Sequence, residues 1–179
     1  MNRSDFALQP FPAGAGLPAV AISGALERRG TFFAITFAIS GQLQEVLLPL
    51  PTPNPARRWL LWEATCCEFF LAVPGAEDYW EVNLSPAGHW NVFHLAGYRR
   101  GIQEEVAISL PALTVRRYRE KITVSLAVDL AAILPADKPW EVAISCVLQD
   151  AQGQLSYWAL NHPAGQPDFH HPASFIITI

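Results

Sequence analysis

Short blocks of alternating apolar and polar residues recur along this chain, and they restrict it to a sheet-forming architecture. Side chains two apart in a strand share one face of a sheet, so a half-buried strand shows this alternation. Blocks of this length that are rich in Val, Ile, Phe and Trp are typical of β-strands. The sequence predicts strands over 19–26, 31–40, 65–73, 79–85, 89–96, 104–110, 113–119, 121–128, 140–149, 155–160 and 174–179. About eleven predicted strands indicate an all-β fold, a sandwich or a barrel.

Only one segment has a helical pattern. Asp129 is placed to cap a short helix over 129–134, and Pro135 follows directly to end it. The chain is therefore predicted to contain at most one short helix.

Residues 79–93 predict a β-hairpin whose register follows from its turn. The segment SPAG at 85–88 is typical of a type I turn followed by a glycine in the left-handed region, a common three-residue hairpin loop. This turn pairs Ser85 with His89, and the further pairs are Leu84 with Trp90, Asn83 with Asn91, Val82 with Val92 and Glu81 with Phe93.

The predicted hairpin has one apolar and one polar face. Alternation places on the apolar face Trp80, Val82, Leu84 and Trp90. It places on the polar face Tyr79, Glu81, Asn83, Ser85, His89 and Asn91. Carboxylates accept hydrogen bonds and amides both donate and accept them, so this face suits a neutral polyhydroxylated ligand better than a phosphate.

Length and composition favour a single globular domain over residues 1–179. The chain has 179 residues, 51% of them hydrophobic, which is enough for one core, and it shows no internal repeat. Its net charge of −4 and its pI near 5.7 argue against a nucleic-acid partner. The local basic run Arg116, Arg117, Arg119 and Lys121 is interpreted as a solvated sheet edge that discourages aggregation.

The sequence shows no membrane or secretion feature. Residues 1–18 lack the apolar core of a signal peptide, and no later run approaches the length of a membrane span. The three cysteines, of which Cys66 and Cys67 are adjacent, do not make a disulfide framework. We therefore expect a cytoplasmic protein without a membrane partner.

Two connections are unusual in composition. The segment LPLPTPNPAR at 48–57 carries four prolines, which cannot donate to a sheet ladder, so it should run extended over the surface. The segment NHPAGQPDFHHP at 161–172 is a long loop, and loops of that length in a compact domain are often functional.

Three segments, in this order, resemble the DOMON-like domains related to family 9 carbohydrate-binding modules: LWEATCCEFF, DYWEVNLSPAGHWNVFHLAGYR and SYWALNHPAGQPDFHHPASFIITI. The resemblance implies an antiparallel β-sandwich of jelly-roll or immunoglobulin-like form, which the strand count puts at about nine to eleven strands. It also implies sugar binding, in which two tryptophans hold a sugar ring and polar side chains bind its hydroxyls. The calcium-ligand clusters of the family have no match here.

The resemblance implies roles for particular residues. Trp62 corresponds to the first of the two tryptophans, Trp158 is the best candidate for the second, and Glu68 stands at the acidic strand position. Alternation assigns Trp80, Trp90 and Trp140 to packing instead. The predicted ligand-binding residues are Trp62, Glu68, Tyr79, Glu81, Asn83, Asn91 and Trp158.

The 161–172 loop also holds candidate metal ligands, His162, Asp168 and His170. Their spacing matches no zinc motif, so hydrogen bonds that tie the loop to the sheet are the preferred interpretation. Some DOMON domains hold haem through methionine and histidine, but Met1 is the only methionine of this chain. A nucleophilic Cys66 or Cys67 is disfavoured by apolar neighbours and an adjacent acid. No cofactor or metal is predicted.

These observations favour a non-catalytic module that binds a carbohydrate or a similar polar small ligand on the polar sheet face. One alternative is a glycan-active enzyme in which Glu68 and Glu81 act as acid and base. The other is a domain that binds a protein partner through a polar face that includes Asn83 and Asn91.

Overall fold

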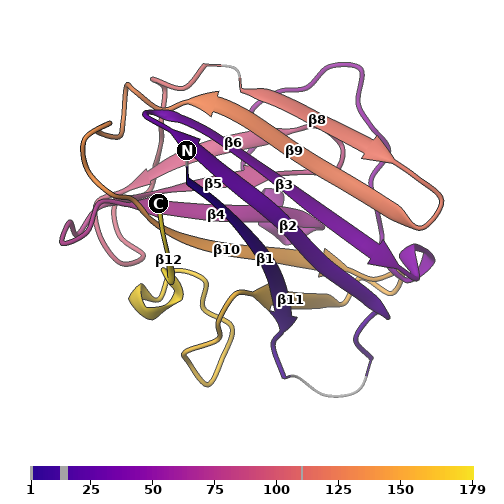
Figure 1. The fold of residues 1–179 in the computed structure, drawn as a ribbon. Coiled ribbons are helices and arrows are strands. Elements are labelled where there is room, and N and C mark those ends of the chain that lie inside the picture. The colour runs from indigo at the N-terminus through magenta and orange to yellow at the C-terminus, as the bar shows by residue number, and fades with distance from the viewer. Residues whose placement is uncertain (1, 13–15, 110) are drawn as a thin grey trace.

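The computed structural model describes residues 2–12, 16–109 and 111–179, which form an antiparallel β structure (Figure 1). The strands are β1 (Asn2–Pro10), β2 (Val20–Arg29), β3 (Phe32–Gly41), β4 (Cys66–Ala72), β5 (Tyr79–Leu84), β6 (Trp90–Leu95), β7 (Gln103–Glu104), β8 (Ala112–Arg117), β9 (Lys121–Asp129), β10 (Glu141–Gln149), β11 (Leu155–Ala159) and β12 (Ile177–Thr178). Three short 3-10 turns complete the fold, η1 (Leu43–Glu45), η2 (Leu61–Glu63) and η3 (Pro172–Ser174).

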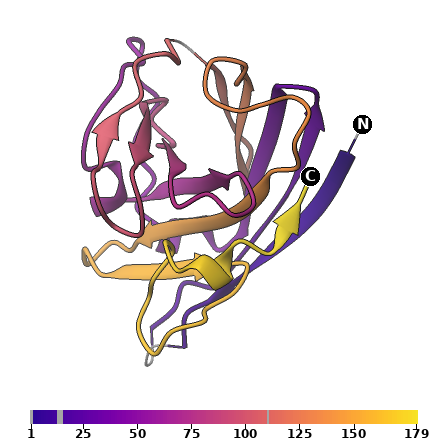
Figure 2. The same ribbon diagram turned by 90° about the vertical axis from the view of Figure 1, so that its left-hand side faces the viewer.

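The strands form one continuous sheet that curls over itself (Figure 2). Their order is β7-β6-β5-β4-β10-β11-β1-β2-β3-β9-β8, with β12 paired to β10. Strand β1 connects the two halves, because residues 2–8 pair with β2 whereas Gln9 and Pro10 pair with β11. We call β1, β2, β3, β9 and β8 the β3 layer, and we call β7, β6, β5, β4, β10, β11 and β12 the β4 layer.

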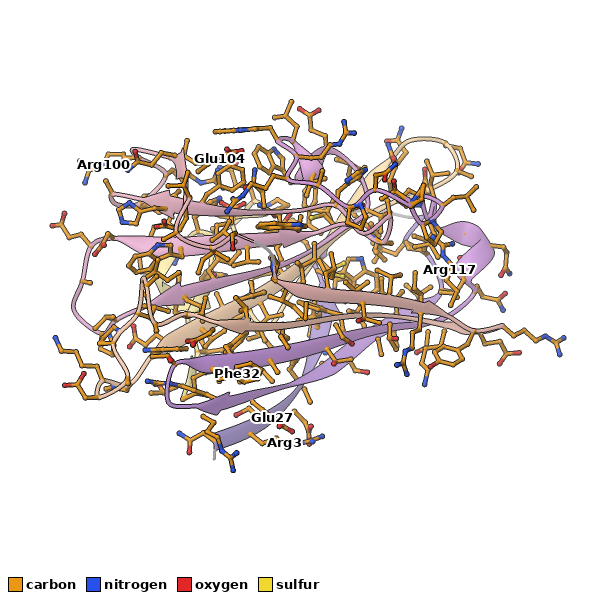
Figure 3. The ribbon with its side chains drawn as sticks, turned by 90° about the horizontal axis from the view of Figure 1, so that it is seen from above. Arg3, Glu27, Phe32, Arg100, Glu104 and Arg117 are labelled. Atoms are coloured by element: carbon orange, nitrogen blue, oxygen red, sulfur yellow. The ribbon has the colours of Figure 1, made fainter. Side chains whose placement is uncertain are left out.

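The core lies between the two layers, and side chains fill the space between them (Figure 3). Phe33 of β3 stacks on Phe69 of β4 with ring centroids 5.1 Å apart, and both rings are fully buried. On the outer side of the β3 layer, Arg3 and Glu27 form an exposed ion pair of 2.9 Å. Burial of apolar area in this shared core is the main stabilising contribution to the fold.

The predicted antiparallel, almost helix-free architecture is confirmed, with differences in four elements. The predicted strand over 174–179 is reduced to β12 at 177–178, because Ser174 belongs to η3. The sequence analysis missed β1, which contributes only Phe6 and Leu8 to the core. The predicted strand over 104–110 is reduced to β7 at 103–104, and Leu110 lies outside the described residues. Residues 129–134 form a single turn rather than a helix; Asp129 accepts from the Ala131 amide, but the chain turns away after Leu134 bonds back to Leu130.

The β5–β6 hairpin has the predicted register. Glu81 pairs with Phe93, Asn83 with Asn91 and Leu84 with Trp90. The turn at 85–88 closes with the Gly88 amide donating to the Ser85 carbonyl, and Gly88 has a φ of 98°, which a side-chain-bearing residue rarely adopts. The register places Glu81 and Asn83 on the outer face of the β4 layer.

A second, smaller apolar cluster covers this outer face. Its buried members come from four strands: Phe70, Tyr79, Phe93, Leu95 and Ala143. Trp62 of η2 and Phe169 of the 161–172 loop pack against it. The outer face, which alternation predicted to be polar, is therefore largely covered by apolar side chains.

The basic run lies along β8 and the turn that follows it. Strand β8 stands at the end of the strand order and pairs only with β9 among the described strands, as expected for a solvated edge. Within the described part of the chain, no helix is both long and apolar enough to cross a membrane.

Candidate ligand-binding site

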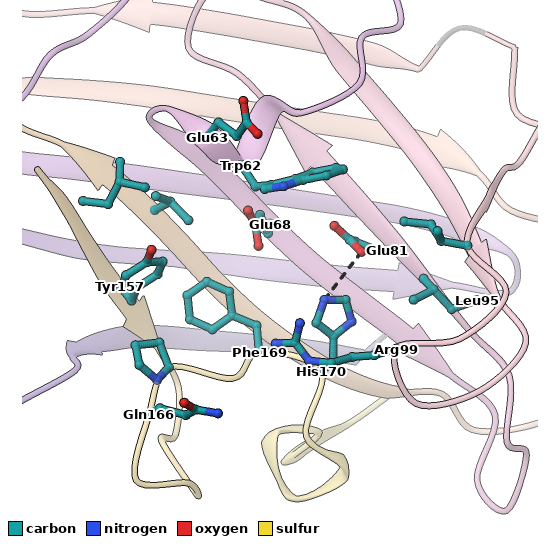
Figure 4. A pocket seen from close by; sticks show the side chains of 14 residues that line it. Trp62, Glu63, Glu68, Glu81, Leu95, Arg99, Tyr157, Gln166, Phe169 and His170 are labelled. Carbon is teal, nitrogen blue, oxygen red and sulfur yellow. Dashed lines mark ion pairs between the residues drawn. The ribbon is translucent and has the colours of Figure 1, made fainter. Parts of the chain in front are cut away.

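A cavity of about 660 Å³ opens on the outer face of the β4 layer (Figure 4). Strands β4 and β5 form its floor, β11 forms one side, and the rest comes from β6, β10, η2, the segment 96–102 and the 161–172 loop. The side chains that determine its chemistry are Trp62, Glu68, Glu81, Tyr157, Phe169 and His170. Its volume lies in the range of small-molecule sites.

Strand alternation and register bring two carboxyl groups to the floor of this cavity. Glu68 of β4 shares its face with Phe70, and Phe70 pairs with Glu81 of β5. Glu68 and Glu81 are therefore diagonal neighbours on one face, a relation in which long side chains reach each other. The intervening residues Cys67, Phe69 and Val82 point the other way, into the core.

Glu68 is 3% exposed, and its two oxygens differ in their surroundings. Oε2 accepts a hydrogen bond of 3.4 Å from the Ser145 hydroxyl, whereas Oε1 has no hydrogen-bond partner among the described residues. Burial, and then the nearby charge of Glu81, raise the pKa of Glu68 well above its ordinary value. Glu68 is therefore a buried acid with one acceptor oxygen left open.

Glu81 is almost as deeply buried as Glu68, but its carboxylate accepts a shorter hydrogen bond. Its Oε1 accepts a hydrogen bond of 2.7 Å from the Asn83 amide. Burial raises its pKa to about 7, while the Asn83 bond and the charge of Arg99 act in the opposite direction. Its Oε2 lies 3.9 Å from Nε2 of His170, the contact that is dashed in Figure 4.

His170 is a neutral histidine at the side of the cavity. Burial and the charge of Arg99 lower its pKa to about 4. Its ring packs edge-on against Phe70 at 5.1 Å, and its Nδ1 lies 2.9 Å from the Tyr79 hydroxyl. The Tyr79 oxygen accepts from the Arg99 amide, so its own proton is available for Nδ1. This network assigns the ring proton to Nε2, facing Glu81.

Arg99 is the cation of the cavity wall, and Asp168 neutralises it. The guanidinium donates to Asp168 from Nη2 at 2.8 Å and from Nε at 3.2 Å. Asp168 also accepts from the Tyr98 hydroxyl and from the His170 amide. Although burial raises the pKa of Asp168, the bonds from Tyr98 and Arg99 bring it below its ordinary value. Asp168 therefore stays ionised and holds the loop to Arg99.

Aromatic side chains form the upper and lateral walls. Trp62 is half-buried on η2 and packs edge-on against Phe93 with centroids 5.7 Å apart. The preceding Leu60 has a left-handed φ of 61°, which turns the chain so that η2 lies over the sheet. Tyr157 and Phe169 contact each other from β11 and the loop at 6.0 Å. These rings offer apolar surfaces next to two acids.

Three of the seven predicted ligand-binding residues line the cavity, and four do not. Trp62, Glu68 and Glu81 come together there. Tyr79 lies behind His170, while Asn83 and Asn91 are fully buried and bonded to protein groups. Trp158 faces the core and is 4% exposed, because it alternates with Tyr157 along β11. The structure does not bring Trp62 and Trp158 to one cavity.

The candidate metal ligands are used in other ways. His162 contacts the carbonyl of Gln9 at 2.9 Å, and Asp168 is engaged by Arg99. Among the described residues, no group of three or more histidine, cysteine or acidic side chains is arranged to hold a metal ion. Met1, on which the haem argument turned, lies outside the described residues.

Sequence reasoning missed Arg99, Tyr157 and Phe169. Tyr157 could have been found, since it alternates with Trp158 and one of the two must face outward. Arg99 and Phe169 lie in loops, where alternation carries no information about direction. Their place in the cavity depends on the Arg99–Asp168 contact between segments 69 residues apart.

Solved structures with the same fold include carbohydrate-binding proteins. A putative carbohydrate-binding protein from Bacteroides uniformis ATCC 8492 is 15% identical, with a TM-score of 0.67 over 94% of this chain and 83% of the other. A family 9 carbohydrate-binding module from Caldicellulosiruptor kristjanssonii in complex with cellotriose is 8% identical, with a TM-score of 0.50 over 84% of this chain and 70% of that module.

A structure of a family 9 module from the same organism in complex with glucose gives 6% identity and a TM-score of 0.50, over 84% of this chain and 72% of that module. At these identities the likeness concerns the fold alone. No protein-family model matches the sequence, and no curated protein matches it.

Proposed function

We propose that this chain is a non-catalytic binding module that holds a carbohydrate or a similar polar small ligand in the cavity on the outer face of the β4 layer. The observation that carries the proposal is the presence of two buried acids, Glu68 and Glu81, beside the half-buried rings of Trp62 and Phe169. Acids accept hydrogen bonds from hydroxyls, and aromatic rings pack against the C–H faces of a sugar.

The structural likenesses support the same proposal. Two of the similar structures are carbohydrate-binding modules that contain cellotriose or glucose. The cavity volume of about 660 Å³ is sufficient for one or two sugar rings. We also propose that the chain is DOMON-like and that its fold is a sandwich of the jelly-roll or immunoglobulin-like kind, as the resemblance implies. The two facing layers support this proposal.

The test is a binding measurement by calorimetry and by tryptophan fluorescence across a panel of neutral, aminated and acidic saccharides. Trp62→Ala should weaken the binding of any sugar found by about ten-fold or more, since it removes the aromatic wall above Glu68. Trp59→Ala is the matched control, because Trp59 also packs on Phe93 but is 50% exposed outside the cavity lining. Silence across the whole panel would contradict the proposal.

The glycan-active enzyme remains an alternative because one observation favours it. The pKa of Glu81 is raised to about 7 and that of Glu68 is raised well above its ordinary value, so the pair can hold one proton at neutral pH. This alternative requires that bound sugars are hydrolysed and that Glu81→Gln stops the reaction. Recovery of intact ligand after prolonged incubation would exclude it.

The protein-interaction alternative loses the residues on which it depended. Asn91 accepts from Arg57 at 2.8 Å and donates to Glu104 at 2.9 Å, and Asn83 donates to Glu81. Both amides are fully buried and unavailable to a partner surface.

A further inference from the structure

The charges that line the cavity are unbalanced in favour of acids. Glu68 and Glu81 form the floor, and Glu63 stands exposed at the rim. Arg99 is the one cationic side chain in the described lining, and Asp168 already neutralises it at 2.8 Å. His170 is neutral at physiological pH, since its pKa lies at about 4. The two floor carboxyls therefore have one nearby cation among the described lining residues, Arg99, whose charge acts on Glu81 but is shared with Asp168.

Glu68 has one carboxylate oxygen that lacks a hydrogen-bond donor among the described residues. This oxygen, Oε1, is buried at the floor. A buried acceptor without a donor costs free energy, and more so when the group is charged. The ligand that fits this floor must supply at least one N–H or O–H to that oxygen.

The neighbouring Glu81 restricts which ligand group is suited to donate to Glu68. Glu68 and Glu81 repel each other when both are ionised, and the charge of Glu81 raises the pKa of Glu68. A sugar hydroxyl could donate to Oε1 but would leave this repulsion in place. An ammonium group has three N–H donors and a positive charge, so it can bind both carboxylates and remove the repulsion.

The aromatic walls favour the same kind of group. Trp62, Tyr157 and Phe169 surround the approach to the two acids (Figure 4). The faces of aromatic rings attract cations, most strongly where water is excluded. A buried acid pair beneath aromatic rings is thus complementary to a cation attached to an otherwise amphipathic body.

We propose that the ligand of this cavity is a saccharide with a free, protonated primary amino group, whose nitrogen lies between Glu68 and Glu81 and donates to Oε1 of Glu68. The inference rests on the proposed function, because it names the class of sugar that the same cavity would bind. The sugar ring would lie against Trp62 and Phe169.

Three trisaccharides with the same β-1,4 linkage test the inference, because they differ only in the substituent at carbon 2. They are the trimer of glucosamine with a free amine, the trimer of N-acetylglucosamine with an amide, and cellotriose with a hydroxyl. Calorimetry with the full chain, at neutral pH, where Glu81 with its pKa of about 7 can be ionised, and at low salt, should show the free amine binding about ten-fold or more tightly than the other two.

Two variants test where the amino group binds. Glu68→Gln and Glu81→Gln should each remove most of the preference for the amine over cellotriose, since each removes one of the two charges. Glu120→Gln is the control for net charge, because Glu120 is an exposed acid in the β8–β9 turn, outside the cavity lining. It should leave the ratio of the two affinities unchanged.

The outcomes separate this inference from the function on which it rests. Equal affinities for the three trisaccharides, or a preference for cellotriose, would contradict the proposal that the ligand carries an amino group. Sugar binding itself would still be supported. If both glutamine variants keep the preference for the amine, the amino group does not bind between Glu68 and Glu81. Absence of binding to any of the three, followed by silence across the wider panel, would overturn both.

Discussion

Glu81 is held between burial, which favours its neutral form, and the Asn83 hydrogen bond, which favours the carboxylate. Burial has the larger effect, so the pKa in the folded chain is about 7 against an ordinary value of 4.5. A raised pKa means that the folded state binds the proton more tightly than the unfolded state does. The resulting stabilisation is complete below about pH 4.5 and is lost as the pH rises through about 7.

The corresponding prediction concerns Glu81→Gln. The interval between the two pKa values corresponds to on the order of 3 kcal/mol, which the wild type should lose between pH 4.5 and pH 8. Glutamine keeps the acceptor for Asn83 without a charge, so the variant should lose less of its unfolding free energy over this interval. Urea denaturation at several pH values measures the slope, and Glu120→Gln serves as the exposed control. Equal slopes for wild type and Glu81→Gln would contradict the assignment.

At the scale of single residues, alternation in the sequence predicted the sheet face on which most side chains lie, but not how deeply they are buried. It correctly placed Trp80, Trp90 and Trp140 on the packing side, and the hairpin turn correctly paired Glu81 with Phe93. The burial of the outer face could not be predicted, because it depends on Phe169 and Trp62 closing over the sheet from loops. Trp158 was assigned to the ligand by resemblance, although alternation with Tyr157 decides its direction.

At the scale of elements, the proline-rich connection acts as an additional edge of the β4 layer. The sequence predicted an extended path over the surface, and the segment runs beside β6. The Trp90 amide donates to the Ala56 carbonyl, and the Arg58 amide donates to the Trp90 carbonyl. Prolines remove amide donors from the segment, so only a few of its residues can form such bonds.

Arg57 fastens this connection to β6 and to the loop after β7. Its guanidinium donates to Asn91 at 2.8 Å, to the Glu105 carbonyl at 2.6 Å and to the Ile108 carbonyl. It also lies 4.4 Å from the centre of the Trp90 ring. One side chain thus satisfies acceptors in two segments, β6 and the loop after β7, and links both to the proline-rich connection.

We predict that Arg57→Ala lowers the free energy of unfolding by about 2 to 4 kcal/mol, because it leaves several half-buried acceptors without a charged donor. Hydrogen exchange should also show weaker protection over the 103–109 loop. Arg58→Ala is the matched control, since Arg58 is exposed and takes part in the β6 contact through its backbone. If both variants unfold at the same urea concentration, Arg57 does not fasten the connection.

The elements that sequence analysis misjudged are those whose pairing is decided by distant segments. Strand β1 has few apolar side chains, and it becomes a strand because β2 and β11 both accept it as a neighbour. Residues 104–110 are rich in apolar residues, yet only 103–104 pair with β6 before the chain leaves the sheet to meet Arg57. Local propensity is overridden in both cases by long-range pairing.

At the scale of the whole molecule, the two layers share one core, although among the described strands only β1 continues from one layer into the other. The tryptophans are unevenly distributed between the layers. All six, Trp59, Trp62, Trp80, Trp90, Trp140 and Trp158, lie in the β4 layer or in segments next to its strands. Tryptophan fluorescence therefore reports the β4 layer, while circular dichroism reports the strands of both layers.

This distribution allows a test of whether the layers unfold together. Phe33→Ala removes a fully buried ring from the β3 layer, where it stacks on Phe69, and should cost about 3 to 5 kcal/mol. Because the core is shared, the fluorescence and circular dichroism transitions in urea should both move by this amount and should stay superimposed. Phe32→Ala is the control, since Phe32 is 49% exposed and should cost less than about 1 kcal/mol. A dichroism transition that moves while the fluorescence transition stays in place would show that the layers are separate folding units, and the cavity would then depend on the β4 layer alone.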